Sequence, residues 1–122
     1  MNAAYGYSCS KVAVDDTELG KLASGFSSTL KAVHGTSFTS GPICTTIYAT
    51  TGSSTDYAYD VSYVPRLFLL YLTEFYHRKI KYSFAAELRD TGNNGFVLPA
   101  NQIRPSGEEV WAGVKYLLAN IK

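Results

Sequence analysis

The chain has 122 residues, enough for one small domain and too few for two. Hydrophobic residues make up 46% of it and charged residues 17%, which is typical of a packed globular protein and argues against disorder. Its 11 basic and 10 acidic residues leave a formal net charge of +1, so charge gives no reason to expect binding to nucleic acid or to a membrane surface.

Targeting signals, apolar runs and cysteine spacing limit the class of protein further. Met1 is followed by neither a basic segment nor an apolar core, so no signal peptide is predicted. The longest apolar run, residues 67–72, is far shorter than the ~20 residues that span a bilayer. Cys9 and Cys44 match no zinc-knuckle or redox spacing, which leaves one disulfide or two free thiols.

The first half of the chain predicts a loop over residues 1–14, a helix and a strand. Asp15 and Glu18 have the spacing of a capping box, and Gly35 is a natural stop, so a helix is expected between them. Its apolar face consists of Leu19, Leu22, Ala23, Phe26, Leu30 and Val33. The β-branched residues 43–49 predict a strand buried on at least one face, and the Ser/Thr/Gly-rich residues 50–55 predict a loop.

The second half predicts another strand and another helix. Residues 80–88 alternate between apolar and polar positions, which favours a strand, and the Asp, Gly and Asn residues in 90–94 favour a turn. Ser106 and Glu109 form a second capping box. It is followed by the apolar face of a C-terminal helix, made of Val110, Trp111, Val114, Leu117, Leu118 and Ile121. The order helix, strand, strand, helix indicates an α/β layer arrangement.

Three blocks of sequence resemble one known family. Residues 80–100 read IKYSFAAELRDTGNNGFVLPA and closely resemble the last strand and following loop of zinc carboxypeptidases of the pancreatic A/B type. Residues 45–56 resemble the loop that closes over the substrate in that family, and residues 17–38 resemble the helix before it. Order and spacing match across nearly the whole chain except residues 61–79, which have no clean period and would be an intron-derived or atypical insertion.

The resemblance implies a fold and an activity. The expected fold is α/β, the C-terminal portion of a three-layer α/β/α sandwich with a mixed sheet, and the chain would be a partial catalytic domain. Glu87 would be the general base that takes a proton from a zinc-bound water and later delivers it to the leaving amine. Tyr48 would fold over the C-terminal carboxylate of the substrate, and Phe96 would lie at the next subsite. Arg89 and Asp90 match structural positions.

The resemblance also implies a substrate preference. The pocket for the C-terminal side chain would be lined by Ile43, Ile47, Thr50 and Thr55. An acidic residue at the position of Thr55 goes with a preference for Lys or Arg, because a buried carboxylate pairs with the cation. Since Thr55 is uncharged, the expected substrates are peptides that end in a neutral hydrophobic residue.

Zinc and a disulfide follow from the same resemblance. The family's zinc ligands are a His-x-x-Glu pair and a third His upstream of the matched region, whereas His34 matches a non-ligand position and His77 lies in the insertion. Zinc is therefore expected in the full-length protein and not in this chain alone, which would be inactive. Cys9 and Cys44 match a cysteine pair of some family members, and their disulfide would stabilise the fold by roughly 4 kcal/mol in the chain-entropy model. A secreted parent would permit this oxidation.

A non-catalytic interpretation stays open beside the enzymatic one. In that alternative the chain is a truncated carboxypeptidase-like protein that acts, if at all, as a binding module. Coding sequence upstream of Met1 that contains the His-x-x-Glu pair would favour the enzyme.

Overall fold

The computed structural model of the chain describes residues 1–60 and 80–122, and the predicted insertion at 61–79 lies outside the described residues. Its elements are β1 (Asn2–Ala3), α1 (Asp16–His34), β2 (Gly41–Pro42), α2 (Ile43–Thr46), α3 (Ser54–Asp60), β3 (Phe84–Ala85) and α4 (Ala100–Asn120). Among these residues, no helix is both long and apolar enough to cross a membrane.

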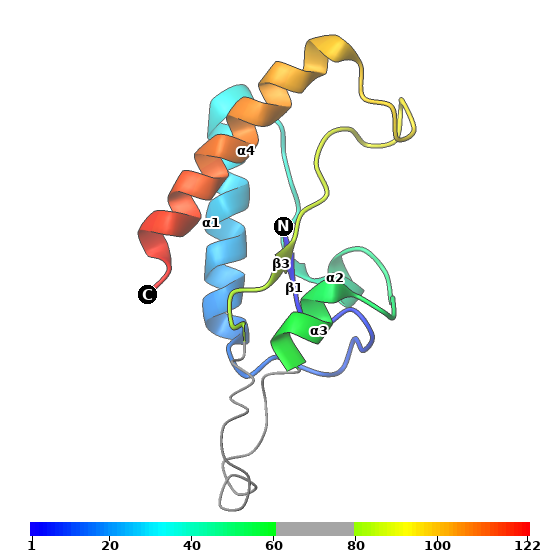
Figure 1. Ribbon diagram of the computed structural model, residues 1–122, viewed down its shortest axis with the longest axis vertical. Coiled ribbons are helices and arrows are strands. Elements are labelled where there is room, and N and C mark those ends of the chain that lie inside the picture. The colour runs from blue at the N-terminus through cyan, green and yellow to red at the C-terminus, as the bar shows by residue number, and fades with distance from the viewer. Residues whose placement is uncertain (61–79) are drawn as a thin grey trace, which may run out of the picture.

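A small mixed sheet lies at the centre of the described chain. Its strand order is β2-β1-β3, with β1 parallel to β2 and antiparallel to β3. In Figure 1, α1 and α4 lie side by side on one side of the strands, and α2 and α3 lie on the other. The predicted α/β class with a mixed sheet is confirmed.

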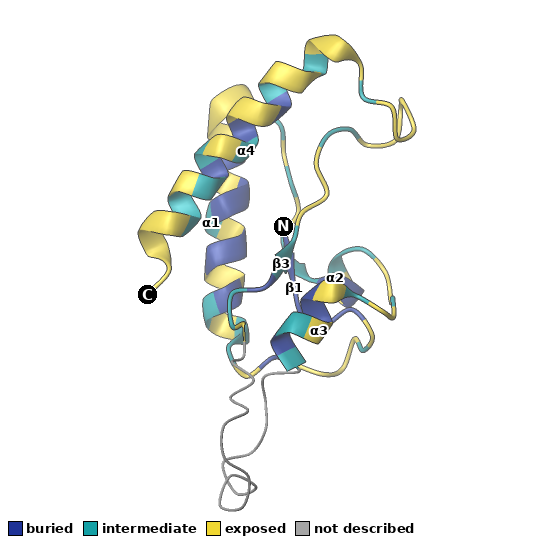
Figure 2. Ribbon diagram, viewed as in Figure 1, coloured by how far each residue is buried: buried dark blue, intermediate teal, exposed yellow. Residues whose placement is uncertain are grey.

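The core forms where α1 meets the sheet and α4. The predicted apolar face of α1 is buried at five positions, Leu19, Leu22, Ala23, Phe26 and Leu30. In Figure 2, buried patches recur along α1 and alternate with exposed ones. Val33, in the last turn, is 38% exposed, so including it in the face was wrong. Phe26 and Leu30 pack with Met1, while Phe84, Tyr116 and Leu117 cover that cluster from β3 and α4. Each large side chain buried in this way contributes about 1.5–3 kcal/mol.

The ends of α1 are where the sequence predicted them, but one cap differs. Gly35 has φ 82°, a left-handed conformation that glycine adopts readily, and its N–H donates to the Lys31 carbonyl at 2.8 Å. Asp15 occupies the N-cap position without a side-chain capping bond. Its carboxylate instead accepts a hydrogen bond from the Tyr59 hydroxyl at 2.8 Å, and Glu18 accepts from the Tyr82 hydroxyl at 2.6 Å. The predicted capping box therefore links the helix to distant segments.

The predicted strand over residues 43–49 is wrong, because Ile43–Thr46 form the short helix α2. The Ile47 N–H donates to the Ile43 carbonyl at 2.9 Å, and the Cys44 N–H donates to the Tyr5 carbonyl at 3.0 Å. These bonds override the β-propensity of the branched side chains. The predicted loop over 50–55 is shorter than expected, since α3 begins at Ser54.

The strands are shorter and differently placed than the pattern predicted. Of residues 80–88, only Phe84 and Ala85 pair with a neighbour, because β1 offers two residues to pair with. The predicted loop over 1–14 contains β1, the central strand. Asn and Ala have low β-propensity, so Asn2–Ala3 gave no strand signal.

The C-terminal helix begins earlier than predicted. α4 starts at Ala100, where the Gln102 N–H donates to the Pro99 carbonyl at 2.9 Å, and Ser106 is buried inside the helix. Pro105 also lies inside it. The later start was expected because Ser106 and Glu109 have the spacing of a capping box, whereas both are buried within the helix. Three residues of the predicted apolar face, Trp111, Leu118 and Ile121, are 60%, 71% and 38% exposed, so including them in the face was wrong.

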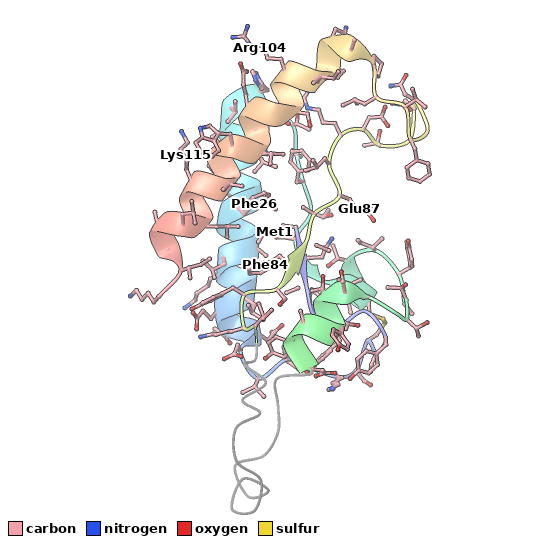
Figure 3. All side chains as sticks on the ribbon, viewed as in Figure 1. Met1, Phe26, Phe84, Glu87, Arg104 and Lys115 are labelled. Carbon is pink, nitrogen blue, oxygen red and sulfur yellow. A yellow bond between two sulfur atoms is a disulfide. The ribbon has the colours of Figure 1, made fainter. Side chains whose placement is uncertain are left out.

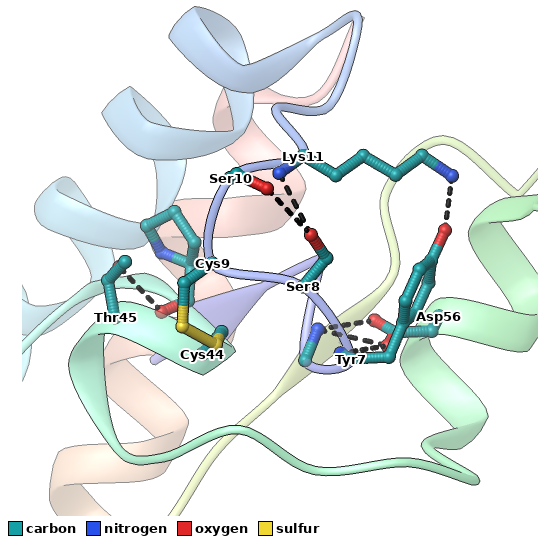
Figure 4. Close-up of a disulfide and its surroundings, with 10 residues drawn as sticks. Tyr7, Ser8, Cys9, Ser10, Lys11, Cys44, Thr45 and Asp56 are labelled. Atoms are coloured by element: carbon teal, nitrogen blue, oxygen red, sulfur yellow. Dashed lines mark hydrogen bonds between the residues drawn. A yellow bond between two sulfur atoms is a disulfide. The ribbon is translucent and has the colours of Figure 1, made fainter.

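The Cys9–Cys44 disulfide is confirmed, with Cα atoms 5.1 Å apart. Figure 4 shows it joining the loop before α1 to α2. Close by, the Asp56 carboxylate of α3 accepts hydrogen bonds from the backbone N–H groups of Gly6 and Tyr7, at 2.9 and 3.2 Å. The disulfide and this buried carboxylate hold the N-terminal loop against α2 and α3.

Two glycines of α4 should respond oppositely to alanine. A Cβ atom on Gly113 would lie 2.4 Å from Leu30 Cδ1 and 2.5 Å from Phe26 Cε2, whereas nothing lies within 4 Å of one on Gly107. We expect Gly113→Ala to lower the free energy of unfolding by about 1–3 kcal/mol through overpacking. Gly107→Ala should raise it by up to about 1 kcal/mol through helix propensity. Urea denaturation of both variants measures this, and equal shifts would contradict the close α1–α4 packing.

Candidate active site

Three predicted site residues line one cavity of about 730 Å³. Tyr48 follows α2, Glu87 follows β3, and Phe96 lies in the loop before α4. The remaining lining residues are Leu88, Arg89, Asp90, Thr91, Gly92, Gly95 and Leu98. The structure therefore brings together side chains from three separate segments.

Glu87 lies two residues beyond β3, where the chain leaves the sheet. Its side chain is exposed and points away from the α1–α4 pair (Figure 3). Among the described residues, its carboxylate has no hydrogen-bond or ion-pair partner. Burial lowers the pKa of the Met1 ammonium, and the negative charge of Glu87 offsets part of that effect. A carboxylate in this setting can accept a proton from a bound water.

Two aromatic side chains, Tyr48 and Phe96, line the cavity. Tyr48 is 63% exposed, and Phe96 is fully exposed. A phenol combines an apolar ring with a hydroxyl that donates and accepts hydrogen bonds, so Tyr48 can cover a ligand and bond to its polar end. Phe96 can offer only apolar contact.

The segment after Glu87 is held in place by an ion pair with α4. The Arg89 guanidinium donates to both carboxylate oxygens of Glu109, with its Nε 2.8 Å from Oε2 and its Nη2 2.5 Å from Oε1. It also donates to Gln102 Oε1 at 2.6 Å and to Thr36 Oγ1 at 2.9 Å. Hydrogen bonds from Arg89 lower the pKa of Glu109, even though burial acts in the opposite direction. Arg89 thus connects the segment that carries Glu87 to α4 and to the loop that follows α1.

The turn predicted at residues 90–94 completes the cavity. The Asp90 carboxylate accepts hydrogen bonds from the backbone N–H groups of Gly92 and Asn94, at 2.7 and 3.2 Å. The Asn94 side-chain amide also donates to it, and these bonds lower the pKa of Asp90. An ionised Asp90 therefore shapes the loop that leads to Phe96.

The other predicted substrate-binding residues do not line this cavity. Ile43 and Thr55 are 5% and 6% exposed, and Ile47 and Thr50 are half-buried. Methyl carbons of Thr50 and Ile43 would lie 3.0 and 3.2 Å from a Cβ atom on Gly6, so these two side chains gather around that glycine. Their role in a specificity pocket stays a prediction.

Sequence reasoning missed two buried carboxylates. Glu109 is 1% exposed and neutralises Arg89, but the sequence assigned it to a capping box. Asp56 is 7% exposed and binds backbone N–H groups beside Thr55. Glu109 lies four residues before Gly113 and therefore on the same face of the helix. Its position on the buried face was the signal that the sequence offered.

The described residues do not fit a zinc site by themselves. Within residues 1–60 and 80–122, no three His, Cys, Asp or Glu side chains lie close enough together to hold a metal ion. His34 has its Nε2 2.8 Å from a carboxylate oxygen of Glu108 on the outer surface of the α1–α4 pair. His77 lies outside the described residues.

Comparison with known proteins places these features in one family. The family model for zinc carboxypeptidases matches residues 1–113, so the chain belongs to the zinc carboxypeptidase family. It is 51% identical over 118 residues to a metallocarboxypeptidase A-like protein of Trichophyton verrucosum, a match that covers 97% of this chain and 24% of that protein. It is 44% identical over 118 residues to carboxypeptidase A2 of Mus musculus, with the same coverage.

One solved structure is similar to this chain in both fold and sequence. Bovine thrombin-activatable fibrinolysis inhibitor, in complex with tick carboxypeptidase inhibitor, is similar with a TM-score of 0.78 and 29% sequence identity. The match covers 97% of this chain and 34% of that one. The chain thus spans about a quarter of the length of the curated relatives it matches.

Proposed function

We propose that this chain supplies part of the active site of a metallocarboxypeptidase that releases the C-terminal residue of peptides. Glu87 acts as the general base, Tyr48 covers the C-terminal end of the substrate, and Phe96 contacts the residue before it. The observation that carries this proposal is the shared cavity of these three side chains in a chain of the zinc carboxypeptidase family.

The setting of Glu87 supports its role as a base. A general base needs an accessible carboxylate within reach of a water and a fixed backbone behind it. Glu87 is exposed, and the bidentate Arg89–Glu109 pair fixes the chain two residues further on. The proton that Glu87 accepts from water can then be given to the leaving amine.

We assign the zinc ligands to the part of the whole protein that this chain does not include. The described residues offer no group of three ligands, and a catalytic zinc needs three protein ligands and an open position. The chain's own contribution is therefore the base and the substrate cover. The alternative, a non-catalytic binding module, is the outcome if the experiment below fails.

A chimeric enzyme tests the proposal. The 118 matched residues of the Trichophyton verrucosum relative are replaced by residues 1–122 of this chain. We expect the chimera to release Phe from a peptide that ends in Phe, and a chelator to stop it. A folded chimera that binds zinc and releases nothing would favour the binding module.

Substrate preference should depend on Thr55. We propose that its buried, uncharged side chain favours neutral hydrophobic C-terminal residues. In the chimera, we compare kcat/KM for a peptide that ends in Lys with kcat/KM for one that ends in Phe. Thr55→Asp should raise the Lys-to-Phe ratio by roughly 10- to 100-fold, because the buried carboxylate needs a cation. Thr55→Asn is the control that adds polarity without charge and should leave the ratio near its starting value. Equal ratios for both variants would contradict a specificity role for this position.

We place the whole protein outside the cell, acting on the C-termini of peptides. The Cys9–Cys44 disulfide supports an oxidising setting, since such bonds persist in secreted proteins. The near-neutral charge supports no role in binding nucleic acid or membrane surfaces.

A further inference from the structure

One buried polar group in the central strand of the sheet has no partner. Asn2 of β1 is 4% exposed, and its side-chain oxygen, Oδ1, accepts no hydrogen bond. Within residues 1–60 and 80–122 it is the one buried side-chain oxygen or nitrogen atom left without a partner. A buried polar atom in this condition lowers stability, so its presence in a folded chain calls for an explanation.

The side chain of Asn2 points to the face of the sheet that carries α2 and α3. On the opposite face, Met1 packs against Phe26 of α1. Phe84, which pairs with Ala3, packs against the same cluster. Because successive side chains of a strand point to opposite faces, Asn2 points away from α1. Figure 1 shows α2 and α3 on that side of the strands.

The strands on either side of Asn2 offer no side-chain donor. Asn2 pairs with Gly41 of β2 and with Ala85 of β3, and the side chains of paired residues point to the same face. Neither glycine nor alanine has a polar side-chain atom. α2 covers this position closely, because a Cβ atom on Gly41 would lie 2.6 Å from Thr46 Oγ1. Even so, the Thr46 hydroxyl makes no hydrogen bond to Oδ1 of Asn2.

Asn2 lies between the predicted specificity pocket and the candidate base. Ile43, one of the four predicted pocket residues, is the first residue of α2, and α2 contacts β1. On the other side of Asn2, Glu87 follows the neighbouring strand β3. Burial lowers the pKa of the Met1 ammonium and the charge of Glu87 acts against it, so Glu87 lies near the start of β1. The unpaired acceptor is therefore close to the place expected for the C-terminal side chain of a substrate.

We infer that Asn2 determines specificity at the inner end of the pocket for the C-terminal side chain, where its Oδ1 accepts a hydrogen bond from that side chain. The favoured substrates end in a neutral residue with a donor, such as the hydroxyl of Tyr or the amide of Gln, rather than in Phe or Met. Because Asn2 is buried, the substrate side chain reaches it by moving neighbouring side chains apart, and the completed hydrogen bond offsets that cost. This inference rests on the proposed function and names its substrate class more closely.

The chimera with the Trichophyton verrucosum relative tests the inference. We compare kcat/KM for two peptides that end in Tyr and in Phe and differ only by the donor. The Tyr-to-Phe ratio should be roughly 10 to 100, because Phe leaves the buried acceptor unpaired. Asn2→Leu keeps the size of the side chain and removes the acceptor, so it should bring the ratio close to one. Asn120→Leu, the same change at an exposed position at the end of α4, is the control and should leave the ratio unchanged.

Equilibrium binding of the same two peptides, measured by calorimetry, separates this inference from the proposed function. A chimera that prefers the Tyr-ending peptide, loses that preference in Asn2→Leu and hydrolyses neither peptide supports the role of Asn2 and contradicts the proposed function. Hydrolysis with a ratio that Asn2→Leu does not change overturns the inference and leaves the proposed function in place. If Asn2→Leu also lowers the midpoint of urea denaturation, Oδ1 pairs with another part of the protein instead.

Two further variants keep the test decisive. If Asn2→Leu does not fold, Asn2→Ala removes the amide without adding volume and takes its place. A chimera without residues 61–79 serves if that segment prevents folding. Binding of neither peptide by a folded chimera overturns the inference.

Discussion

Replacing Glu109 with glutamine is expected to lower the free energy of unfolding of the chain by about 3–5 kcal/mol. Glu109 is 1% exposed and Arg89 14% exposed, so the variant leaves the guanidinium buried without a counter-charge. Urea denaturation followed by circular dichroism measures the change. Glu108→Gln is the matched control, because Glu108 is 42% exposed and pairs with Arg104 and His34 on the surface. Such a pair contributes about 0–1 kcal/mol, so equal losses for the two variants would contradict the buried pair.

The dependence of stability on acidic pH should report the same ion pair between Arg89 and Glu109. Arg89 lowers the pKa of Glu109 below its ordinary value of 4.5 in the folded chain. The stability that this carboxylate contributes is therefore complete above pH 4.5, and it is lost as the pH falls through the lower, folded pKa. We expect unfolding free energy to fall more steeply with acid in the wild-type chain than in Glu109→Gln. Other paired carboxylates titrate in both proteins, so the difference between the two curves isolates Glu109, and parallel curves would contradict this assignment.

Local patterns predicted α1 because its determinants are local. The apolar period and Gly35 specify where the helix runs and where it ends, and both are visible in the sequence. The same reasoning misplaced the start of α4, since the capping-box spacing of Ser106 and Glu109 falls inside the helix Ala100–Asn120 rather than at its start.

The strands and the buried ion pair could not be predicted from local patterns, because both depend on contacts between segments that are distant in the sequence. Asn2–Ala3 is the central strand because its neighbours pair with it, although neither residue favours a strand. Residues 43–46 became a helix although their side chains favour strands. Glu109 is buried because Arg89 reaches it from a segment 20 residues away, and patterns place charged residues on the surface.

The candidate site depended on resemblance rather than on pattern. By alternation alone, Glu87 is a surface residue on a strand, and Tyr48 is one of ten tyrosines. The resemblance of residues 45–56 and 80–100 to the family singled out both of them and Phe96, and the structure places the three around one cavity. The four residues expected in a specificity pocket do not line that cavity: Ile43 and Thr50 gather around Gly6, Thr55 is buried, and Ile47 is half-buried.

Glu87→Gln should abolish most of the activity of the chimera while leaving its fold intact. Glutamine keeps the size and polarity of the side chain and cannot accept a proton from water, so kcat should fall by about 10²- to 10⁴-fold, the range typical of a lost general base. KM should change little, because the peptide is held by other groups. Stability should also change little, since Glu87 is exposed and has no hydrogen-bond partner among the described residues.

Steady-state kinetics on a Phe-ending peptide, with zinc content and circular dichroism measured on the same samples, test this expectation. Glu108→Gln, also an exposed glutamate, is the control and should keep full activity. If Glu87→Gln lowered zinc content together with kcat, the loss would reflect a damaged metal site rather than a missing base. If it retained more than about one tenth of the activity, Glu87 would not be the base, because even a modest general base contributes about 100-fold. A selective loss of kcat would leave proton transfer at the Glu87 carboxylate as the step that was removed.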